Sequence, residues 1–173
     1  MKDIEDNLDL DWDWNGIAIN PNLTIDFIKK YINKFQDVWD IISKNRNITL
    51  NIIESNLCLP WNFRGISCNL NLTINFIIAN PNENWDWDGI SSNSNISMYD
   101  IESNLEYTWN YNWISKNPNL TEEFISKHFN ENWNWTYISM NLNITFDIVK
   151  KHIWPWNWYS LSQNPNISEA TLR

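Results

Sequence analysis

The sequence predicts an all-α protein, an α-solenoid of about seven repeats of 24 residues, each a pair of short helices joined by an Asn-rich turn. Three observations lead to this fold class. One phrase of residues recurs along nearly the whole chain, each copy carries two helix-start signals, and Gly is almost absent, with 3 among 173 residues. A regular period of this length is typical of stacked repeat proteins.

The repeat is defined by aromatic residues and asparagines. Its first Trp recurs at intervals of 24 residues, or within one residue of that, and Asp37 replaces it in the second repeat. A second aromatic residue, an Ile or Leu and a small residue follow, and two asparagines separated by one residue form the turn. The Trp series is Trp12, Trp61, Trp85, Trp109, Trp133 and Trp156, and the Asn pairs begin at Asn20, Asn45, Asn69, Asn93, Asn117, Asn141 and Asn164.

The second helix of each repeat is predicted to start at a hydroxyl residue. Ser and Thr are favoured N-caps because their side-chain oxygen accepts a hydrogen bond from a free backbone N–H of the first turn. Apolar residues flank this position in six repeats as a hydrophobic staple, as Leu23 and Ile28 do around Thr24. The structural caps are therefore Thr24, Thr49, Thr73, Ser97, Thr121, Thr145 and Ser168.

The first helix is predicted to start between the two aromatic residues, where Asp or Asn stands in six repeats and Val38 in the second. We expect about two turns for this helix and two to three turns for the second one. The first Asn of each pair should end the first helix in the left-handed conformation that Asn tolerates. A row of stacked Asn side chains should also hydrogen-bond from one repeat to the next.

One alternative fold stays open, because "WDWNGIAIN" also alternates apolar and polar residues as a strand does. That alternative is a leucine-rich-repeat-like α/β solenoid. The two capping signals favour helices. We expect a single repeat domain over residues 1–173, with residues 1–11 as a degenerate N-terminal cap. The repeats lie near 12–36, 37–60, 61–84, 85–108, 109–132, 133–155 and, as a partial copy, 156–173.

The phrase W-[DN]-W-x-x-I-S-x-N-x-N-[IL]-[TS] resembles tandem repeats encoded by giant amoeba-infecting viruses of the mimivirus type. The resemblance covers residues 12–173, and the surplus of Asn and Ile fits an AT-rich genome. It implies a viral repeat protein and brings no activity with it. The chain departs from the phrase at Asp37 and Ala18, which makes the first helix of the second repeat the least certain.

Composition and charge limit the function classes. The net charge of −9 argues against nucleic acid, which requires a basic stripe. Two cysteines are too few for a disulfide framework, and we expect buried or half-buried thiols in a reducing compartment. The acidic N-terminal segment lacks the apolar stretch of a signal peptide, and no apolar run suits a membrane span. We expect an intracellular protein, in the host cytoplasm or the virion, that is not secreted.

No catalytic motif is present, so we expect no enzyme and no cofactor. His128 and His152 lie one repeat apart, and two imidazoles can bind a metal, but Asn stands in the equivalent position of other repeats. That pattern indicates a polar helix end, where His suits the helix dipole, and we expect no metal. The Asn-x-Ser/Thr pattern in every repeat also matches glycosylation sites. Asn turns and hydroxyl caps produce the same pattern without glycosylation.

A candidate binding patch stands out where the repeat varies. Trp113, Tyr137 and Tyr159 place extra aromatic residues on neighbouring repeats, whereas the regular Trp–x–Trp pairs indicate core. Exposed aromatic patches are typical of protein-binding surfaces. The alternative is that these rings only pack between repeats. We expect a non-enzymatic scaffold that binds another protein, for which a host protein is the natural candidate.

The second functional hypothesis is self-assembly. Neither end of the repeat series resembles a dedicated polar cap, and an uncapped solenoid exposes an apolar end face. Such a face allows a dimer or a filament to form. The chain is then a structural component and a homo-oligomer.

Overall fold

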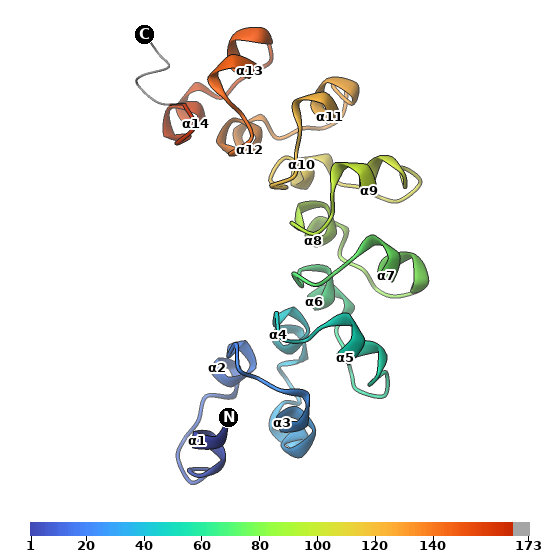
Figure 1. Ribbon diagram of the computed structural model, residues 1–173, viewed down its shortest axis with the longest axis vertical. Coiled ribbons are helices and arrows are strands. Elements are labelled where there is room, and N and C mark those ends of the chain that lie inside the picture. Colours follow the sequence, from blue (N-terminus) through green and yellow to red (C-terminus); the bar gives the residue numbers. More distant parts are fainter. Residues whose placement is uncertain (168–173) are drawn as a thin grey trace. The chain divides into compact units, whose positions relative to one another are not determined.

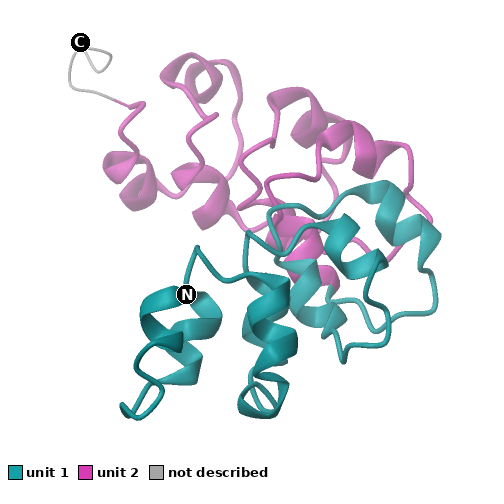
Figure 2. Cartoon of the chain, turned by 60° about the horizontal axis from the view of Figure 1, so that its bottom comes forward, with its two compact units in different colours: residues 1–86 teal, residues 87–173 magenta. Residues whose placement is uncertain are grey.

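The computed structural model describes residues 1–167, and within them every regular element is a helix and no strand occurs. The predicted all-α solenoid is therefore confirmed. A leucine-rich-repeat-like fold requires a strand in each repeat, so the described residues contradict that alternative. The chain divides into two compact units, an N-terminal unit of residues 1–86 and a C-terminal unit of residues 87–173 (Figure 2).

The N-terminal unit holds two rows of helices, with α2, α4 and α6 in one row and α3, α5 and α7 in the other (Figure 1). Along the first row α2 contacts α4, and α4 contacts α6. Each repeat supplies one helix to each row. The elements are α1 (Lys2–Glu5), α2 (Trp14–Ile19), α3 (Ile25–Lys30), the 3₁₀ helix η1 (Ile32–Lys34), α4 (Trp39–Lys44), α5 (Leu50–Glu54), α6 (Phe63–Ser67) and α7 (Ile74–Ala79).

The C-terminal unit repeats this arrangement, with α8, α10, α12 and α14 in the first row and α9, α11 and α13 in the second (Figure 1). Here α8 contacts α10, and α12 contacts α14. The elements are α8 (Trp87–Ser92), α9 (Met98–Glu102), α10 (Tyr111–Ile114), α11 (Glu122–Lys127), α12 (Trp135–Met140), α13 (Phe146–Lys151) and α14 (Trp158–Gln163).

Side-chain caps begin most helices of the repeats, although Val38 provides none for α4. The Thr24 hydroxyl accepts a hydrogen bond from the Phe27 N–H at 3.3 Å, and Thr49, Thr73, Ser97 and Thr121 do the same in their helices. Thr145 is the N-cap of α13 but makes no side-chain capping bond, and Ser168 lies outside the described residues. The first helices are capped by Asp13, Asn62, Asn110, Asn134 and Asn157.

The second helices, of five or six residues, are shorter than the two to three turns expected. After α5, α7, α9, α11 and α13 the first Trp of the following repeat binds the chain just beyond the helix end. The Trp61 indole N–H donates to the carbonyl oxygen of Asn56 at 2.9 Å, and Trp109 and Trp133 bind Asn104 and His128 in the same way. The indole thus satisfies a carbonyl just beyond the helix and turns the chain toward the next repeat.

The expectation that Asn ends the first helices in a left-handed conformation is wrong. Asn45 has φ −64° and ψ 127°, and no non-glycine residue in the described part of the chain has a positive φ. The helix ends through side-chain chemistry instead. The Asn45 Oδ1 accepts the Asn47 N–H at 2.9 Å, which fixes an extended turn.

The first Asn of each pair also binds the preceding repeat, and we call this series of contacts the asparagine ladder. In the C-terminal unit the buried Asn117 shares its Nδ2 hydrogens among the carbonyl oxygens of Ser91, Asn93 and Ile96, at 3.0–3.1 Å. In the N-terminal unit, Asn69 makes the same three contacts with the repeat before it. The prediction that stacked Asn side chains bond from repeat to repeat is confirmed within each unit.

The small residue of the phrase forms a second link between repeats. The buried Ser115 hydroxyl accepts the backbone N–H of Asn134, the cap of the next first helix, at 3.0 Å. Ser43, Ser91 and Ser139 accept from the corresponding N–H of the following repeat. The regular Ser therefore satisfies a donor that no helix partner reaches.

The first two repeats depart from this pattern together. Ala18 has no hydroxyl, and the Val38 N–H that would pair with it donates to the Phe35 carbonyl at 3.3 Å. The fully buried Phe35 ring also packs edge-on against Trp14, with centroids 5.1 Å apart, as Trp61 packs against Trp39 at 5.2 Å. Phe35, two places before Asp37, therefore supplies the ring that the aligned position lacks.

The backbone of α4 approaches α6 closely at Gly65. A Cβ added at Gly65 of α6 would lie 2.6 Å from the Asp40 carbonyl oxygen and 2.9 Å from the Ser43 Cβ, both in α4. The neighbouring backbone blocks any larger residue there. Ile41 and Tyr137 occupy the equivalent position of α4 and α12.

We predict that Gly65→Ala lowers the free energy of unfolding by about 1–3 kcal/mol, because this overlap outweighs the gain in helix propensity of about 1 kcal/mol. Gly16→Ala is the matched control. Its Cβ would meet nothing closer than the Asp13 carboxylate oxygen at 3.4 Å, so the substitution should stabilise by about 0.5–1 kcal/mol. Urea unfolding measures both, and equal shifts of the two variants would contradict the close approach.

We predict that removing one residue of the asparagine ladder lowers the stability of the fold. Asn117→Ala leaves buried carbonyl oxygens without a donor, so the free energy of unfolding should fall by at least about 2 kcal/mol. Hydrogen exchange should also accelerate at the Asn119 N–H, which loses its acceptor on Asn117. Asn130→Ala, at an exposed turn position, should change stability by less than about 0.5 kcal/mol. If the two variants unfold alike, the ladder is not a main source of stability.

Candidate functional site

Lys116 contacts two aromatic rings of the candidate patch. Trp113 of α10 and Tyr137 of α12 are half-buried, and the Lys116 ammonium lies between them, 4.2 Å from the Trp113 ring centroid and 4.0 Å from that of Tyr137. A cation at this distance from an aromatic face is attracted by the negative face of the ring. We call Trp113, Lys116 and Tyr137 the aromatic–lysine cluster.

Two residues of the site differ from the sequence expectation. Tyr159 on α14 is 75% exposed, and among the ring contacts of the described residues none joins it to Trp113 or Tyr137, so it lies outside this cluster. Lys116 was not among the predicted patch residues. The sequence contained a pattern that could have predicted it. Lys116 follows Trp113 by three residues, a spacing that places both side chains on one side of the chain.

A groove opens beside the cluster. Its volume is about 400 Å³, and its wall is largely apolar. Met140 and Leu142 are 48% and 61% exposed there, so apolar surface is open to solvent. The lining residues are Lys116, Pro118, Tyr137, Met140, Asn141 and Leu142.

The charge of Lys116 is not neutralised within the described residues. No carboxylate among them lies within ion-pair distance of its Nζ. By contrast, the Lys127 Nζ lies 2.9 Å from the Glu102 Oε1, and the Lys151 Nζ lies 2.6 Å from the Glu122 Oε1. The cluster therefore presents one positive charge next to apolar surface.

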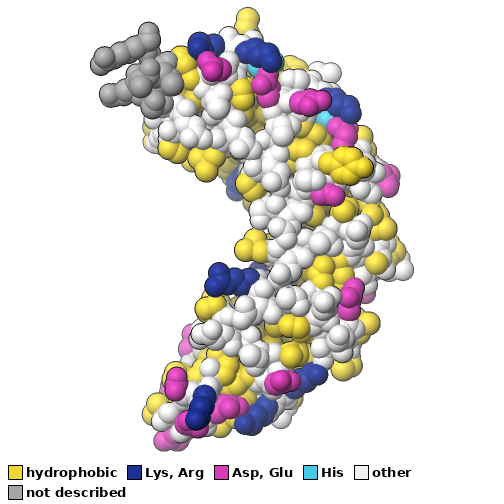
Figure 3. Space-filling model, in the orientation of Figure 1, with side chains coloured by type: hydrophobic (Ala, Val, Ile, Leu, Met, Phe, Trp, Pro, Cys, Tyr) yellow, Lys and Arg dark blue, Asp and Glu magenta, His cyan; other side chains and the backbone are white. Residues whose placement is uncertain are grey.

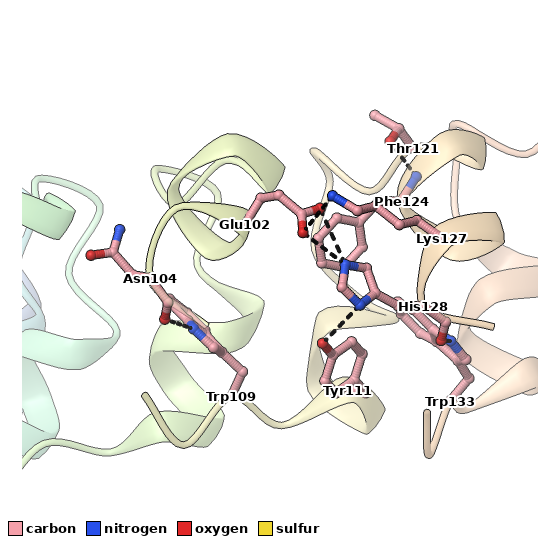
Figure 4. Close-up of polar contacts among 9 residues, drawn as sticks. All are labelled: Glu102, Asn104, Trp109, Tyr111, Thr121, Phe124, Lys127, His128 and Trp133. Atoms are coloured by element: carbon pink, nitrogen blue, oxygen red, sulfur yellow. Dashed lines mark hydrogen bonds and ion pairs between the residues drawn. The ribbon is translucent and has the colours of Figure 1, made fainter. Parts of the chain in front are cut away.

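A polar cluster on the second helix row surrounds His128 (Figure 4). The His128 Nε2 lies 3.0 Å from Glu102 Oε1, and its Nδ1 lies 3.4 Å from the Tyr111 hydroxyl. This geometry fits an Nε2–H that donates to Glu102 and an Nδ1 that accepts from Tyr111, a proton placement that we assign from these partners. Since both ring nitrogens are engaged, the imidazole links α9, α10 and α11.

The electrostatics of this cluster follow from its partners. The hydrogen bond from Lys127, with that from His128, holds the pKa of Glu102 below its usual value. Burial raises the pKa of Tyr111 to about 12, because the phenolate is poorly solvated there. Tyr111 is therefore neutral at physiological pH and available as a donor to His128.

His152 occupies the same place one repeat later but binds a different acid. Its Nε2 lies 2.6 Å from the Glu122 Oε1, which also accepts from Lys151. Each histidine thus has its own carboxylate, and the two do not form one site. Over residues 1–167 no group of three or more His, Cys, Asp or Glu side chains is placed to hold a metal ion.

The expectation of buried or half-buried thiols is wrong for Cys58, which is free and exposed. Cys68 is also free and exposed as a residue, but partial burial of its thiol raises the pKa of that group. Cys68 stands at the last position of the α6 region, where its side chain leaves the core, and Cys58 lies in the turn after α5. Position in the turn therefore decides exposure here, against the usual preference of cysteine for burial.

The visible surface carries no charge stripe of one sign. In Figure 3, Lys and Arg side chains lie among Asp and Glu side chains, and hydrophobic ones are scattered between them. Across residues 1–167 no helix has the length and apolar composition to cross a membrane. Comparison of the chain with known protein families, with curated proteins and with solved structures found no match. The resemblance to giant-virus repeats therefore stays a prediction, and function must be argued from geometry.

We predict that Glu102→Gln lowers stability at pH 7. Because the pKa of Glu102 is lower in the folded chain than the ordinary value of 4.5, its stabilising contribution is present above that pH. The contribution disappears as the pH falls through the folded pKa, so the difference from wild type should shrink below about pH 4.5. Glu106→Gln, an exposed position outside the cluster, is the control. Urea midpoints at pH 7 and pH 3 measure both, and a difference that persists at pH 3 would contradict the assignment.

Proposed function

We propose that the protein is a non-enzymatic repeat scaffold that binds a protein partner, and that the aromatic–lysine cluster with its groove is the contact site. The observation that carries this proposal is the position of the Lys116 ammonium. It lies between two aromatic rings, has no ion-pair partner among the described residues and stands beside exposed apolar surface. Tyr and Trp that are anchored rather than mobile are frequent hot spots, since little side-chain entropy is lost on binding.

The surrounding structure supports a rigid binding surface. The asparagine ladder ties α10 and α12 to their neighbours through Asn117 and Asn141, whose side chains are buried. A surface fixed in this way is preorganised, which reduces the cost of ordering it in a complex. An intracellular location is part of the proposal, because both cysteines are free.

An affinity capture from nuclease-treated amoebal extract tests the proposal. We expect the wild type to retain a protein that the Trp113→Ala/Tyr137→Ala variant loses by at least about tenfold, since hot-spot truncation costs about 2 kcal/mol or more. Tyr99→Ala removes an exposed aromatic residue of α9 outside the groove and should bind as wild type does. Circular dichroism verifies that each variant is folded.

Two outcomes would count against the proposal. Retention of the same proteins by all three forms would show that the cluster is not the contact site. Capture of nothing but further copies of the chain, together with light scattering that grows with concentration, would favour the self-assembling component instead.

A further inference from the structure

We propose that the chain carries two equivalent grooves, one in each compact unit, and that each binds an acidic segment of a partner chain whose apolar side chains enter the groove. This inference rests on the proposed function, because it names the partner's chemistry for the same site. It adds a second site and a binding stoichiometry of two.

The second groove lies in the N-terminal unit between α2 and α4 and has a volume of about 530 Å³. Its lining comes from the same positions of the repeat, although the basic residues stand at different ones, Lys116 in the first groove and Lys44 and Arg46 in the second. Pro21 corresponds to Pro118, Ile41 to Tyr137, and Asn45 to Asn141, and each of these residues lines its groove. The remaining lining residues are Ile19, Lys44 and Arg46.

Two positions of the repeat together account for where the grooves lie, a large side chain in the first helix and a Pro in the turn of the preceding repeat. Where the helix position is Gly65, the two repeats meet at backbone distance and leave no room for a Cβ. Where it is Ile41 or Tyr137, a large side chain stands at the edge of the preceding repeat and forms a wall of the groove. Each groove also follows a Pro between its two asparagines, Pro21 or Pro118, which is the other wall.

The charge of both grooves has the same sign. Their lining includes Lys44, Arg46 and Lys116 and no Asp or Glu, although the chain has 21 acidic residues against 12 basic ones. Lys44 has only a distant partner, with its Nζ 3.9 Å from an Asp40 oxygen and both side chains about half exposed. Such a pair is worth little and yields readily to another carboxylate.

These features define the occupant. Basic groups at the rim of an apolar groove favour carboxylates that lie close to apolar side chains, as in an extended segment that alternates Asp or Glu with Leu, Ile or Phe. Volumes of 400–530 Å³ suit a few side chains of a peptide rather than a helix pair. Nucleic acid fits less well, because the walls are apolar and the net charge of −9 repels phosphate.

The test selects ligands without assuming a sequence. A phage-displayed library of random 12-residue peptides is panned on the full-length wild type, and the selected peptides should be enriched in Asp and Glu together with large apolar residues. One selected peptide is then synthesised and titrated calorimetrically. We expect two peptides per chain and an affinity that falls at least about tenfold between 50 and 500 mM salt.

Charge-removing variants separate the two grooves. Lys116→Gln should bind one peptide per chain, in the N-terminal groove. Lys44→Gln/Arg46→Gln should bind one peptide in the C-terminal groove. The triple variant should bind at least about tenfold more weakly at both grooves. Lys29→Gln, an exposed basic residue of α3 outside both grooves, is the matched control and should bind two peptides. Thermal unfolding monitors the fold of each variant.

Each contrary result has a distinct meaning. Selected peptides without acidic residues, or equal binding by the triple variant, would overturn the charge recognition. A stoichiometry of one would overturn the second groove. If no peptide is selected while extract capture still depends on Trp113 and Tyr137, this inference fails and the scaffold proposal stands. If the capture also fails, the proposed function fails with it.

Discussion

The asparagine ladder is the interaction on which the rest of the structure depends. Helices of four to six residues leave most of their terminal N–H and C=O groups without partners inside the helix. A buried Asn donates to two or three carbonyl oxygens of the repeat before it, and its own oxygen holds the turn that follows. This holds for the turns that begin at Asn45, Asn69, Asn117, Asn141 and Asn164. Stacking therefore depends on directional hydrogen bonds as well as on the apolar rows. This explains why the turns are rich in Asn and poor in Gly.

The ladder also constrains where binding surface can form. Within each unit Asn and Ser tie most repeats to their neighbours, so we expect the repeat to vary at the positions that these bonds leave free. Gly65 and Tyr137 occupy one such position with opposite results, a backbone contact in the first case and the wall of a groove in the second. Lys116 occupies another, and two rings hold its ammonium at the groove. Single side chains therefore decide whether two neighbouring repeats meet at backbone distance or leave a groove between them.

Much of the fold followed from the sequence because capping is local chemistry. A hydroxyl or Asn with apolar flanks specifies a helix start whatever lies beyond it, and the structure has helices at those places, from Thr24 to Asn157. The helix ends were predicted less well, since they depend on an indole from the next repeat, as Trp61 on Asn56 shows. Phe35 shows the same limit, because its ring fills the place that the alignment gave to Asp37. A period in the sequence records spacing along the chain, not which ring reaches a site.

By itself, the sequence determined the all-α class, the repeat length, both capping series and the candidate rings Trp113 and Tyr137. Those features depend on residue types within a few positions of one another. Only the tertiary structure decided that Lys116 joins the two rings, that Tyr159 stands apart and that the cysteines are exposed. It also decided that His128 and His152 bind separate glutamates. Each of these depends on the distance between residues of different helices, which the packing of neighbouring repeats sets and the order of residues does not record.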